Sequence, residues 1–151
     1  MEKGRFLAVC FDFSGVIVDH RDKRPVPGIG ELIRELHACG RLLAVVSRYG
    51  EETVAEHLGE ELCRCFRKIY SARDRSKLEC VAEFAGECGI GDLSAVAFVD
   101  DKPQNLQAVA GSPVRVIGFR GSGKYDTAGA CREIGVPFAG TVSELRGLLG
   151  L

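Results

Sequence analysis

The strongest constraint on the fold is a regular alternation of short apolar runs with segments of helical periodicity. Five runs rich in β-forming residues are too short for independent helices and predict buried strands at residues 6–13, 41–47, 65–71, 94–100 and 114–119. Segments between and after them predict helices at residues 28–40, 51–63, 76–88, 103–111 and 141–150. Strands joined through helices pair in parallel, with helices on both faces. We therefore expect a three-layer, Rossmann-like α/β fold around a five-stranded parallel sheet.

The length, charge and cysteine content narrow the range of functions. The 151 residues suit one domain, spanning residues 1–151, and the formal net charge of −1 gives no overall attraction to nucleic acids or acidic membranes. No apolar segment is long enough to cross a membrane, and the first residues do not form a signal peptide pattern. The seven cysteines are an odd number, which favours free thiols in a reducing cytoplasm. We expect a cytoplasmic protein without nucleic-acid or membrane partners.

Polar side chains follow the apolar runs where each predicted strand ends. Asp12, Ser47 and the pair Asp100 and Asp101 end three of the runs, and Lys77 begins the helix after a fourth. Because ligands of an open parallel sheet bind outside the carboxyl ends of its strands, we expect these residues to gather at one edge. Three carboxylates in one place repel one another unless a cation lies among them, and Mg²⁺ with oxygen ligands fits such a cluster.

This set of residues is suited to phosphoryl transfer. A carboxylate such as Asp12 can act as a nucleophile toward phosphorus and form an aspartyl-phosphate. The charge on the transferring group needs donors and cations around it, which the Ser47 hydroxyl, the Lys77 ammonium and backbone N–H groups of residues 13–15 can supply. Gly15 would let the backbone approach the phosphate closely.

Four motifs in order resemble those of the haloacid dehalogenase superfamily, a group of mostly Mg²⁺-dependent phosphatases and phosphotransferases. They are FDFSGVIVD (residues 11–19), LLAVVS (42–47), SK (76–77) and AFVDDKPQN (97–105). The proline that usually follows the lysine is replaced by Leu78. The resemblance covers nearly the whole chain, and it implies the superfamily's α/β fold and a phosphorylated substrate.

The resemblance also implies roles for individual residues. Asp12 would be the nucleophile and a metal ligand, with the Ser14 backbone carbonyl and Asp100 as further ligands. Asp101 and Asn105 would hold metal-bound water or orient the loop. Ser47 and Lys77 would bind the phosphoryl group.

Position 14 departs from the superfamily's phosphatases. These enzymes carry an acid two residues after the nucleophile, which protonates the leaving oxygen and then activates water, whereas this chain has Ser14. Loss of general acid–base help costs about 10²- to 10⁴-fold in rate. Two interpretations stay open: a slow Mg²⁺-dependent phosphohydrolase, and a phosphate-binding or interaction protein that keeps the scaffold without turnover.

The spacing of the first two motifs leaves no room for an inserted cap domain. Only 34 residues separate Asp12 from Ser47, and residues 28–40 already form the joining helix. Residues 19–27 are then a short flap, and the resemblance implies that such an open site takes a bulky or macromolecular substrate or a roof from another subunit. The expected partner is a phosphorylated substrate, either a small molecule or a macromolecule, and a homo-oligomer is left open. Asp19 and His20 on this flap can substitute as acid or base, although a solvated loop is the favoured interpretation.

Three further segments have a simpler interpretation than a binding site. The GSGK sequence within residues 120–130 lacks phosphate-loop spacing and is interpreted as a flexible turn. Cys63 and Cys65 lack nearby partners for a zinc site. The basic residues of segment 64–75 follow an acidic helix, which favours compensating solvated faces over an anion-binding patch.

Overall fold

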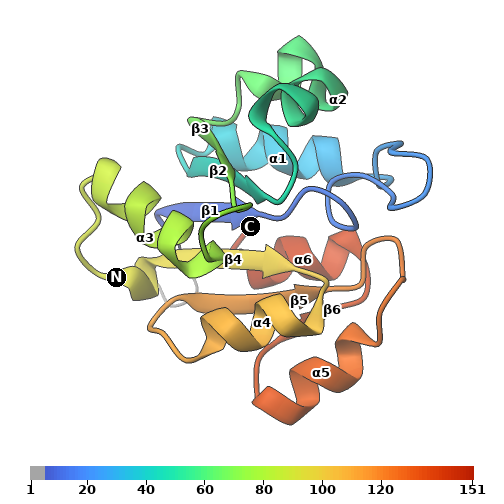
Figure 1. Ribbon diagram of the computed structural model, residues 1–151, viewed down its shortest axis with the longest axis vertical. Coiled ribbons are helices and arrows are strands. Elements are labelled where there is room, and N and C mark those ends of the chain that lie inside the picture. The colour runs from blue at the N-terminus through green and yellow to red at the C-terminus, as the bar shows by residue number, and fades with distance from the viewer. Residues whose placement is uncertain (1–5) are drawn as a thin grey trace.

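Strands and helices alternate along residues 6–151, which are the residues described by a computed structural model of the protein. The strands are β1 (Ala8–Phe11), β2 (Leu42–Ser47), β3 (Lys68–Ser71), β4 (Val96–Asp100), β5 (Arg115–Phe119) and β6 (Phe138–Ala139). The helices are α1 (Ile29–Ala38), α2 (Glu51–Cys63), α3 (Lys77–Glu87), α4 (Pro103–Ala110), α5 (Thr127–Ile134) and α6 (Val142–Leu148), with a short 3₁₀ turn at Leu93–Ala95. The predicted parallel α/β architecture with helices on both faces is confirmed (Figure 1).

The strand order places a switch in direction at the centre of the sheet. All strands pair in parallel in the order β3-β2-β1-β4-β5-β6. Cys10 in β1 lies opposite Ala44 in β2 and Phe98 in β4. The chain therefore winds outward from β1 on one side and from β4 on the other. A crevice for ligands is expected outside the carboxyl ends of these two strands.

Each face of the sheet has its own hydrophobic core because successive side chains of a strand point to opposite faces. Val9 and Phe11 of β1 pack with α1, α2 and α6, whereas Ala8 and Cys10 pack with α3, α4 and α5. Figure 1 shows the two helix layers on either side of the sheet. Strands buried on both faces account for the continuous apolar runs in the sequence.

The expected number of five strands is wrong, because β6 adds a sixth strand at the edge beyond β5. This strand is only two residues long, Phe138–Ala139, and so carries no periodic signal. The GSGK sequence, residues 121–124, lies outside the helices and strands as expected, but the end of segment 120–130 is helical, since α5 begins at Thr127. Asp126 caps this helix by accepting a hydrogen bond from the Gly129 N–H. Few apolar residues mark its buried side, which is why the sequence pattern missed it.

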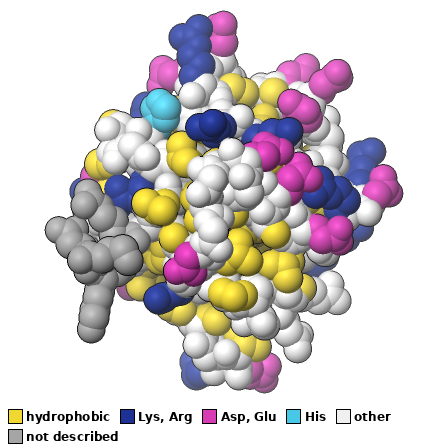
Figure 2. Space-filling view, turned by 90° about the vertical axis from the view of Figure 1, so that its left-hand side faces the viewer, with side chains coloured by type: hydrophobic (Ala, Val, Ile, Leu, Met, Phe, Trp, Pro, Cys, Tyr) yellow, Lys and Arg dark blue, Asp and Glu magenta, His cyan; other side chains and the backbone are white. Residues whose placement is uncertain are grey.

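The face at the amino ends of the strands mixes charges of both signs. In Figure 2, the Lys and Arg side chains lie among Asp and Glu side chains, with hydrophobic side chains between them. Such a mixed face has no strong field of one sign, in line with the small net charge of the chain. Within residues 6–151, the helices are too short or too polar to cross a lipid bilayer.

Gly118 in β5 provides a test of the packing between the sheet and α5. A Cβ added at Gly118 would lie 2.1 Å from Cys131 Sγ, whereas one at Gly86 in α3 meets nothing within 4 Å. We predict that Gly118→Ala lowers the free energy of unfolding by about 1–3 kcal/mol through overpacking. Gly86→Ala should raise it by up to about 1 kcal/mol because alanine favours a helix. Urea unfolding measures the stability of both variants. Adding Cys131→Ala to Gly118→Ala should recover stability, because it removes the sulfur atom that the new methyl group meets. If no stability is recovered, the packing explanation is contradicted.

Candidate active site

Three buried carboxylates meet at the carboxyl ends of the two central strands. Asp12 directly follows β1, and its N–H donates to the Val99 carbonyl of β4 at 2.9 Å. Asp100 is the last residue of β4, and Asp101 follows it. Because β1 and β4 are neighbours, the side-chain oxygens of these three aspartates lie within 4.8 Å of one another. The sheet topology alone thus creates a concentrated negative charge.

Lys77 supplies a cation to this cluster from the start of α3. The helix begins there because Ser76 and Glu79 form a capping box, each side chain accepting a bond from the other's backbone N–H. The buried Lys77 Nζ donates to Asp12 Oδ1 at 2.7 Å and to Asp100 Oδ2 at 3.0 Å. The sequence-predicted lysine is therefore in direct contact with the predicted nucleophile.

The neighbouring aspartates 100 and 101 differ in how their oxygens are used. Asp100 Oδ1 accepts from the N–H groups of Asp101 and Lys102 at 2.7 and 2.9 Å, and its Oδ2 accepts from Asn105 Nδ2 at 3.1 Å. Both carboxylate oxygens of Asp101 are buried without a hydrogen bond from the described residues. Thr127 Oγ1 holds the backbone of Asp101 by donating to its carbonyl at 2.6 Å. Asp101 thus offers two buried oxygens to a further partner.

Burial and the charges of neighbouring groups shift the pKa values of the clustered side chains. Burial, followed by repulsion from Asp100, raises the pKa of Asp12 to about 7 despite the attraction of Lys77. Burial, followed by repulsion from Asp12 and Asp100, raises the pKa of Asp101 to about 8. Burial lowers the pKa of Lys77, but the carboxylates of Asp12 and Asp100 outweigh it and leave that pKa raised. One ammonium does not neutralise three carboxylates, so the site fits an additional hard cation with oxygen ligands.

Ser47 and Gly15 lie beside the carboxylates, where phosphate-binding groups were expected. The Ser47 side chain is buried at the end of β2, and its Oγ accepts from the Tyr49 N–H at 3.0 Å. Gly15 has a φ of 93°, and a Cβ there would lie 2.2 Å from His20 Cε1 and 2.3 Å from Asp101 Oδ2. Only glycine therefore leaves room for both side chains.

The loop after β5 packs against the loop after β1. The Ser122 N–H donates to the Gly15 carbonyl at 3.1 Å. Gly121 lies so close to the same carbonyl that a Cβ on it would be 1.6 Å from the Gly15 oxygen. The segment that follows Asp12 is thus held by residues more than a hundred positions further along the chain.

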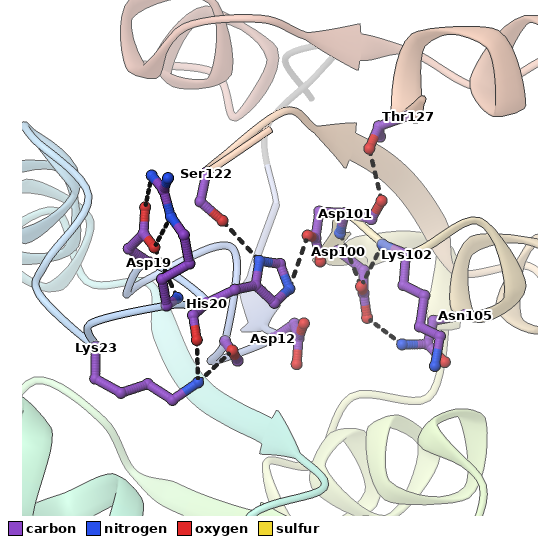
Figure 3. Close-up of polar contacts among 12 residues, drawn as sticks. Asp12, Asp19, His20, Lys23, Asp100, Asp101, Lys102, Asn105, Ser122 and Thr127 are labelled. Carbon is purple, nitrogen blue, oxygen red and sulfur yellow. Dashed lines mark hydrogen bonds and ion pairs between the residues drawn. The ribbon is translucent and has the colours of Figure 1, made fainter. Parts of the chain in front are cut away.

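His20 is part of the site, which corrects the favoured interpretation of residues 19–27 as a solvated loop. Its Nδ1 lies 2.7 Å from Ser122 Oγ, and its Nε2 lies 3.5 Å from Asp101 Oδ2 (Figure 3). Asp19, in contrast, pairs with the exposed Arg21 next to it in the loop. The partners of His20 are far away in sequence, so no local pattern could have indicated its position.

Lys23 from the same segment contacts the residue at the atypical position of the first motif. Its Nζ donates to Ser14 Oγ and to the His20 carbonyl, both at 2.9 Å (Figure 3). The same ammonium lies 4.9 Å from the centre of the Tyr49 ring. An ammonium thus lies against the hydroxyl of Ser14, two residues after Asp12.

The site contains a cavity of about 310 Å³ that is lined by twelve residues. Six of its lining residues were predicted from the sequence: Asp12, Ser14, Ser47, Lys77, Asp101 and Asn105. Sequence reasoning did not assign the other six to the site: His20, Arg48, Tyr49, Arg73, Lys102 and Tyr125. Arg48 and Lys102 directly follow Ser47 and Asp101, and Tyr49 is two positions after Ser47, so closeness in sequence to predicted site residues is the signal that could have indicated them. Arg73 and Tyr125 lie in loops, where no such signal exists.

Three of the five basic residues in segment 64–75 pair with acids, as the favoured interpretation expects, whereas Arg67 and Arg73 have no acidic partner among residues 6–151, and Arg73 lines the cavity. Arg64, Lys68 and Arg75 lie 3.5, 3.8 and 2.6 Å from the carboxylates of glutamates 60, 87 and 83. All seven cysteines are free, in agreement with the sequence. Among residues 6–151, one group of acidic, cysteine or histidine side chains lies close enough together to hold a metal ion, and it is the cluster of Asp12, Asp100 and Asp101.

Comparison with known proteins identifies the class of fold. No family model matches the sequence, and no curated protein matches it. Solved structures do match, among them 3-deoxy-D-manno-octulosonate 8-phosphate phosphatase from Moraxella catarrhalis in complex with magnesium, phosphate and KDO. It is 19% identical, with a TM-score of 0.72, over 95% of this chain and 85% of that one.

Two further structures of similar size extend this result. A haloacid dehalogenase superfamily hydrolase from Ehrlichia chaffeensis matches with a TM-score of 0.71 and 14% identity, over 96% of both chains. A haloacid dehalogenase-like hydrolase from Streptococcus pneumoniae matches with a TM-score of 0.77 and 12% identity, over 94% of this chain and 97% of that one. The chain therefore has the fold of haloacid dehalogenase superfamily hydrolases.

Lys77 should be essential to the stability of this site. We predict that Lys77→Met lowers the free energy of unfolding by about 3–5 kcal/mol in metal-free buffer, because it leaves buried carboxylates without their cation. Adding Asp101→Asn should recover part of the loss by removing one repelling charge. Lys68→Met is the control, since that lysine is exposed and should change stability by less than about 1 kcal/mol. Urea unfolding measures the series, and equal losses at positions 77 and 68 would contradict the prediction.

Proposed function

We propose that this protein is a Mg²⁺-dependent phosphohydrolase that passes a phosphoryl group through an aspartyl-phosphate at Asp12. The observation that carries the proposal is the geometry of three residues: Lys77 Nζ donates to Asp12 at the sheet's switch point, beside the Asp101 oxygens, which accept no hydrogen bond from the described residues. The fold supports it, because the structures that resemble it include phosphatases and one complex with magnesium and phosphate.

The residues present fit a magnesium ion. Asp12, Asp100 and Asp101 offer carboxylate oxygens within 4.8 Å of one another, and the Ser14 backbone carbonyl would add a ligand. The oxygens of Asp101 supply free positions for the ion or for a water on it. When bound, Mg²⁺ would offset the charge of the carboxylates and of the phosphoryl oxygens.

Each side chain of the site then has a separate role in phosphoryl transfer. Ser47 Oγ and Lys77 Nζ bind the phosphoryl oxygens, together with N–H groups next to Gly15. The Asp12 carboxylate forms a bond to phosphorus while the bond to the alcohol oxygen breaks, and the leaving alkoxide takes a proton from solvent water. Water then attacks the phosphorus of the aspartyl-phosphate, which releases inorganic phosphate and restores Asp12. The open pocket without a cap admits the substrate directly.

A second candidate function, phosphate binding without turnover, is favoured by one observation. The Ser14 hydroxyl, which replaces the superfamily's acid, is held by the Lys23 ammonium at 2.9 Å. A hydroxyl is far too weak an acid to exchange protons efficiently at neutral pH. One feature argues against this second function: His20 also lines the pocket, and its imidazole supplies an exchangeable proton where position 14 has no acid.

Hydrolysis of 4-nitrophenyl phosphate distinguishes the two functions. With Mg²⁺ we expect multiple turnovers per chain, and none after chelation with EDTA. Asp12→Asn should lower the rate by about 10³-fold or more because the nucleophile is lost. Asp22→Asn, in the exposed part of the loop, is the control and should keep the rate. Phosphate binding by calorimetry with no turnover would reject hydrolysis and support the second function.

The side chain at position 14 should control the rate. We predict that Ser14→Asp raises steady-state hydrolysis by about 10²-fold or more, because it supplies the missing acid–base group. Lys23 Nζ lies where it would pair with the new carboxylate, so the variant is also made together with Lys23→Met. Ser14→Ala is the matched control and should give no gain. An unchanged rate in both aspartate variants would show that acid–base help is not what limits the enzyme.

A further inference from the structure

The pocket contains cations that the proposed reaction does not use. Arg48 and Arg73 line it, and neither has an Asp or Glu oxygen within ion-pair distance among residues 6–151. Other exposed arginines do pair with acids, for example Arg34 with Glu61 at 2.9 Å. Two unpaired guanidinium groups beside a phosphate site indicate an anion among their natural partners.

A phosphate group alone does not neutralise the positive charges that line the pocket. Lys77 and a bound Mg²⁺ together match the three carboxylates of the cluster. Arg48, Arg73 and Lys102 then remain as positive charges on the lining. A phosphomonoester carries a charge of about −1.5 to −2 at neutral pH. About one positive charge is left for another part of the substrate.

The two arginines that line the cavity are joined by one hydrogen bond. Arg48 directly follows Ser47, and Arg73 lies in the loop between β3 and α3. Arg73 Nε donates to the Arg48 carbonyl at 3.2 Å, which fixes the direction of its guanidinium while its two terminal nitrogens have no bond from the described residues. A guanidinium with free terminal nitrogens can hold a carboxylate or phosphate by two parallel bonds.

The volume of the cavity and the tyrosines in its wall indicate how large and how apolar the rest of the substrate is. The cavity of about 310 Å³ is at the small end of the range for ligand pockets. The Tyr49 and Tyr125 rings belong to its wall and offer surface to an apolar linker. Both features favour a small substrate over a macromolecule.

We propose that the substrate is a small phosphomonoester with a second anionic group, a carboxylate or phosphate, that binds Arg48 and Arg73. This inference rests on the proposed function for the placement of the transferred phosphate at Ser47 and Lys77. The second anion then orients the substrate by its far end, a task that a cap performs where one is present.

The test compares substrates that differ only in the second anion. The probes are 2-carboxyethyl, 3-carboxypropyl and 4-carboxybutyl phosphate, each beside its neutral partner, propyl, butyl or pentyl phosphate, together with propane-1,3-diyl bisphosphate. We expect at least one anionic probe to exceed its neutral partner in kcat/KM by about 10- to 100-fold, mainly through KM. Arg48→Gln and Arg73→Gln should reduce this ratio toward one, and Arg73→Lys should retain part of it.

Arg67→Gln is the matched control, because Arg67 is exposed and does not line the cavity. It should keep the full ratio. If the arginine variants weaken anionic and neutral probes equally, these residues bind the transferred phosphate, and the inference is overturned. Equal kcat/KM for the paired probes in the unmodified protein overturns it as well.

Binding to the Asp12→Asn variant separates this inference from the proposed hydrolysis. Calorimetry with Mg²⁺ measures the dissociation constants of the same probe pairs without turnover. Tighter binding of the anionic probes, lost in Arg73→Gln, supports the second-anion site even if the unmodified protein hydrolyses none of them. Turnover of all probes with no difference in affinity supports the hydrolase and rejects the second-anion site.

Discussion

The contact on which the rest of the site depends is the ion pair between Lys77 and the carboxylates of Asp12 and Asp100. Neighbouring parallel strands bring their terminal acids together, and burial makes their mutual repulsion expensive. Lys77 relieves that repulsion only in part, and both carboxylate oxygens of Asp101 have no hydrogen bond from the described residues, with His20 Nε2 3.5 Å from Oδ2. The cluster is therefore still short of positive charge, which is the condition under which buried carboxylates bind a hard cation.

Much of the fold and the centre of the site could be predicted from the sequence because both follow from local patterns. Short apolar runs buried on two faces predicted the five longer strands, and the polar residues at their ends had to meet at one edge. Asp12 directly follows β1, Ser47 is the last residue of β2, and Lys77 is the first residue of α3. At such places the backbone fixes the side chain's position before any tertiary contact is known.

The remaining features depend on contacts between distant segments. β6 is two residues long and is recognised only by its pairing with β5, and α5 buries too few apolar side chains to show a helical period. His20 is placed by Ser122, which lies 102 residues further along the chain. The pocket arginines are exposed, so their charge pattern in the sequence looks like that of any solvated surface. Their significance comes from the lack of acidic partners around them.

The close packing of Gly121 against the Gly15 carbonyl joins two loops into one mechanical unit. Because the Ser122 N–H donates to the same carbonyl, a shift of the peptide at Gly15 breaks this hydrogen bond unless the loop after β5 moves with it. Any side chain at position 121 would displace the Gly15 carbonyl and, with it, the backbone next to Ser14. A substitution in the loop after β5 therefore reshapes the loop after β1 without any change to that loop's own sequence.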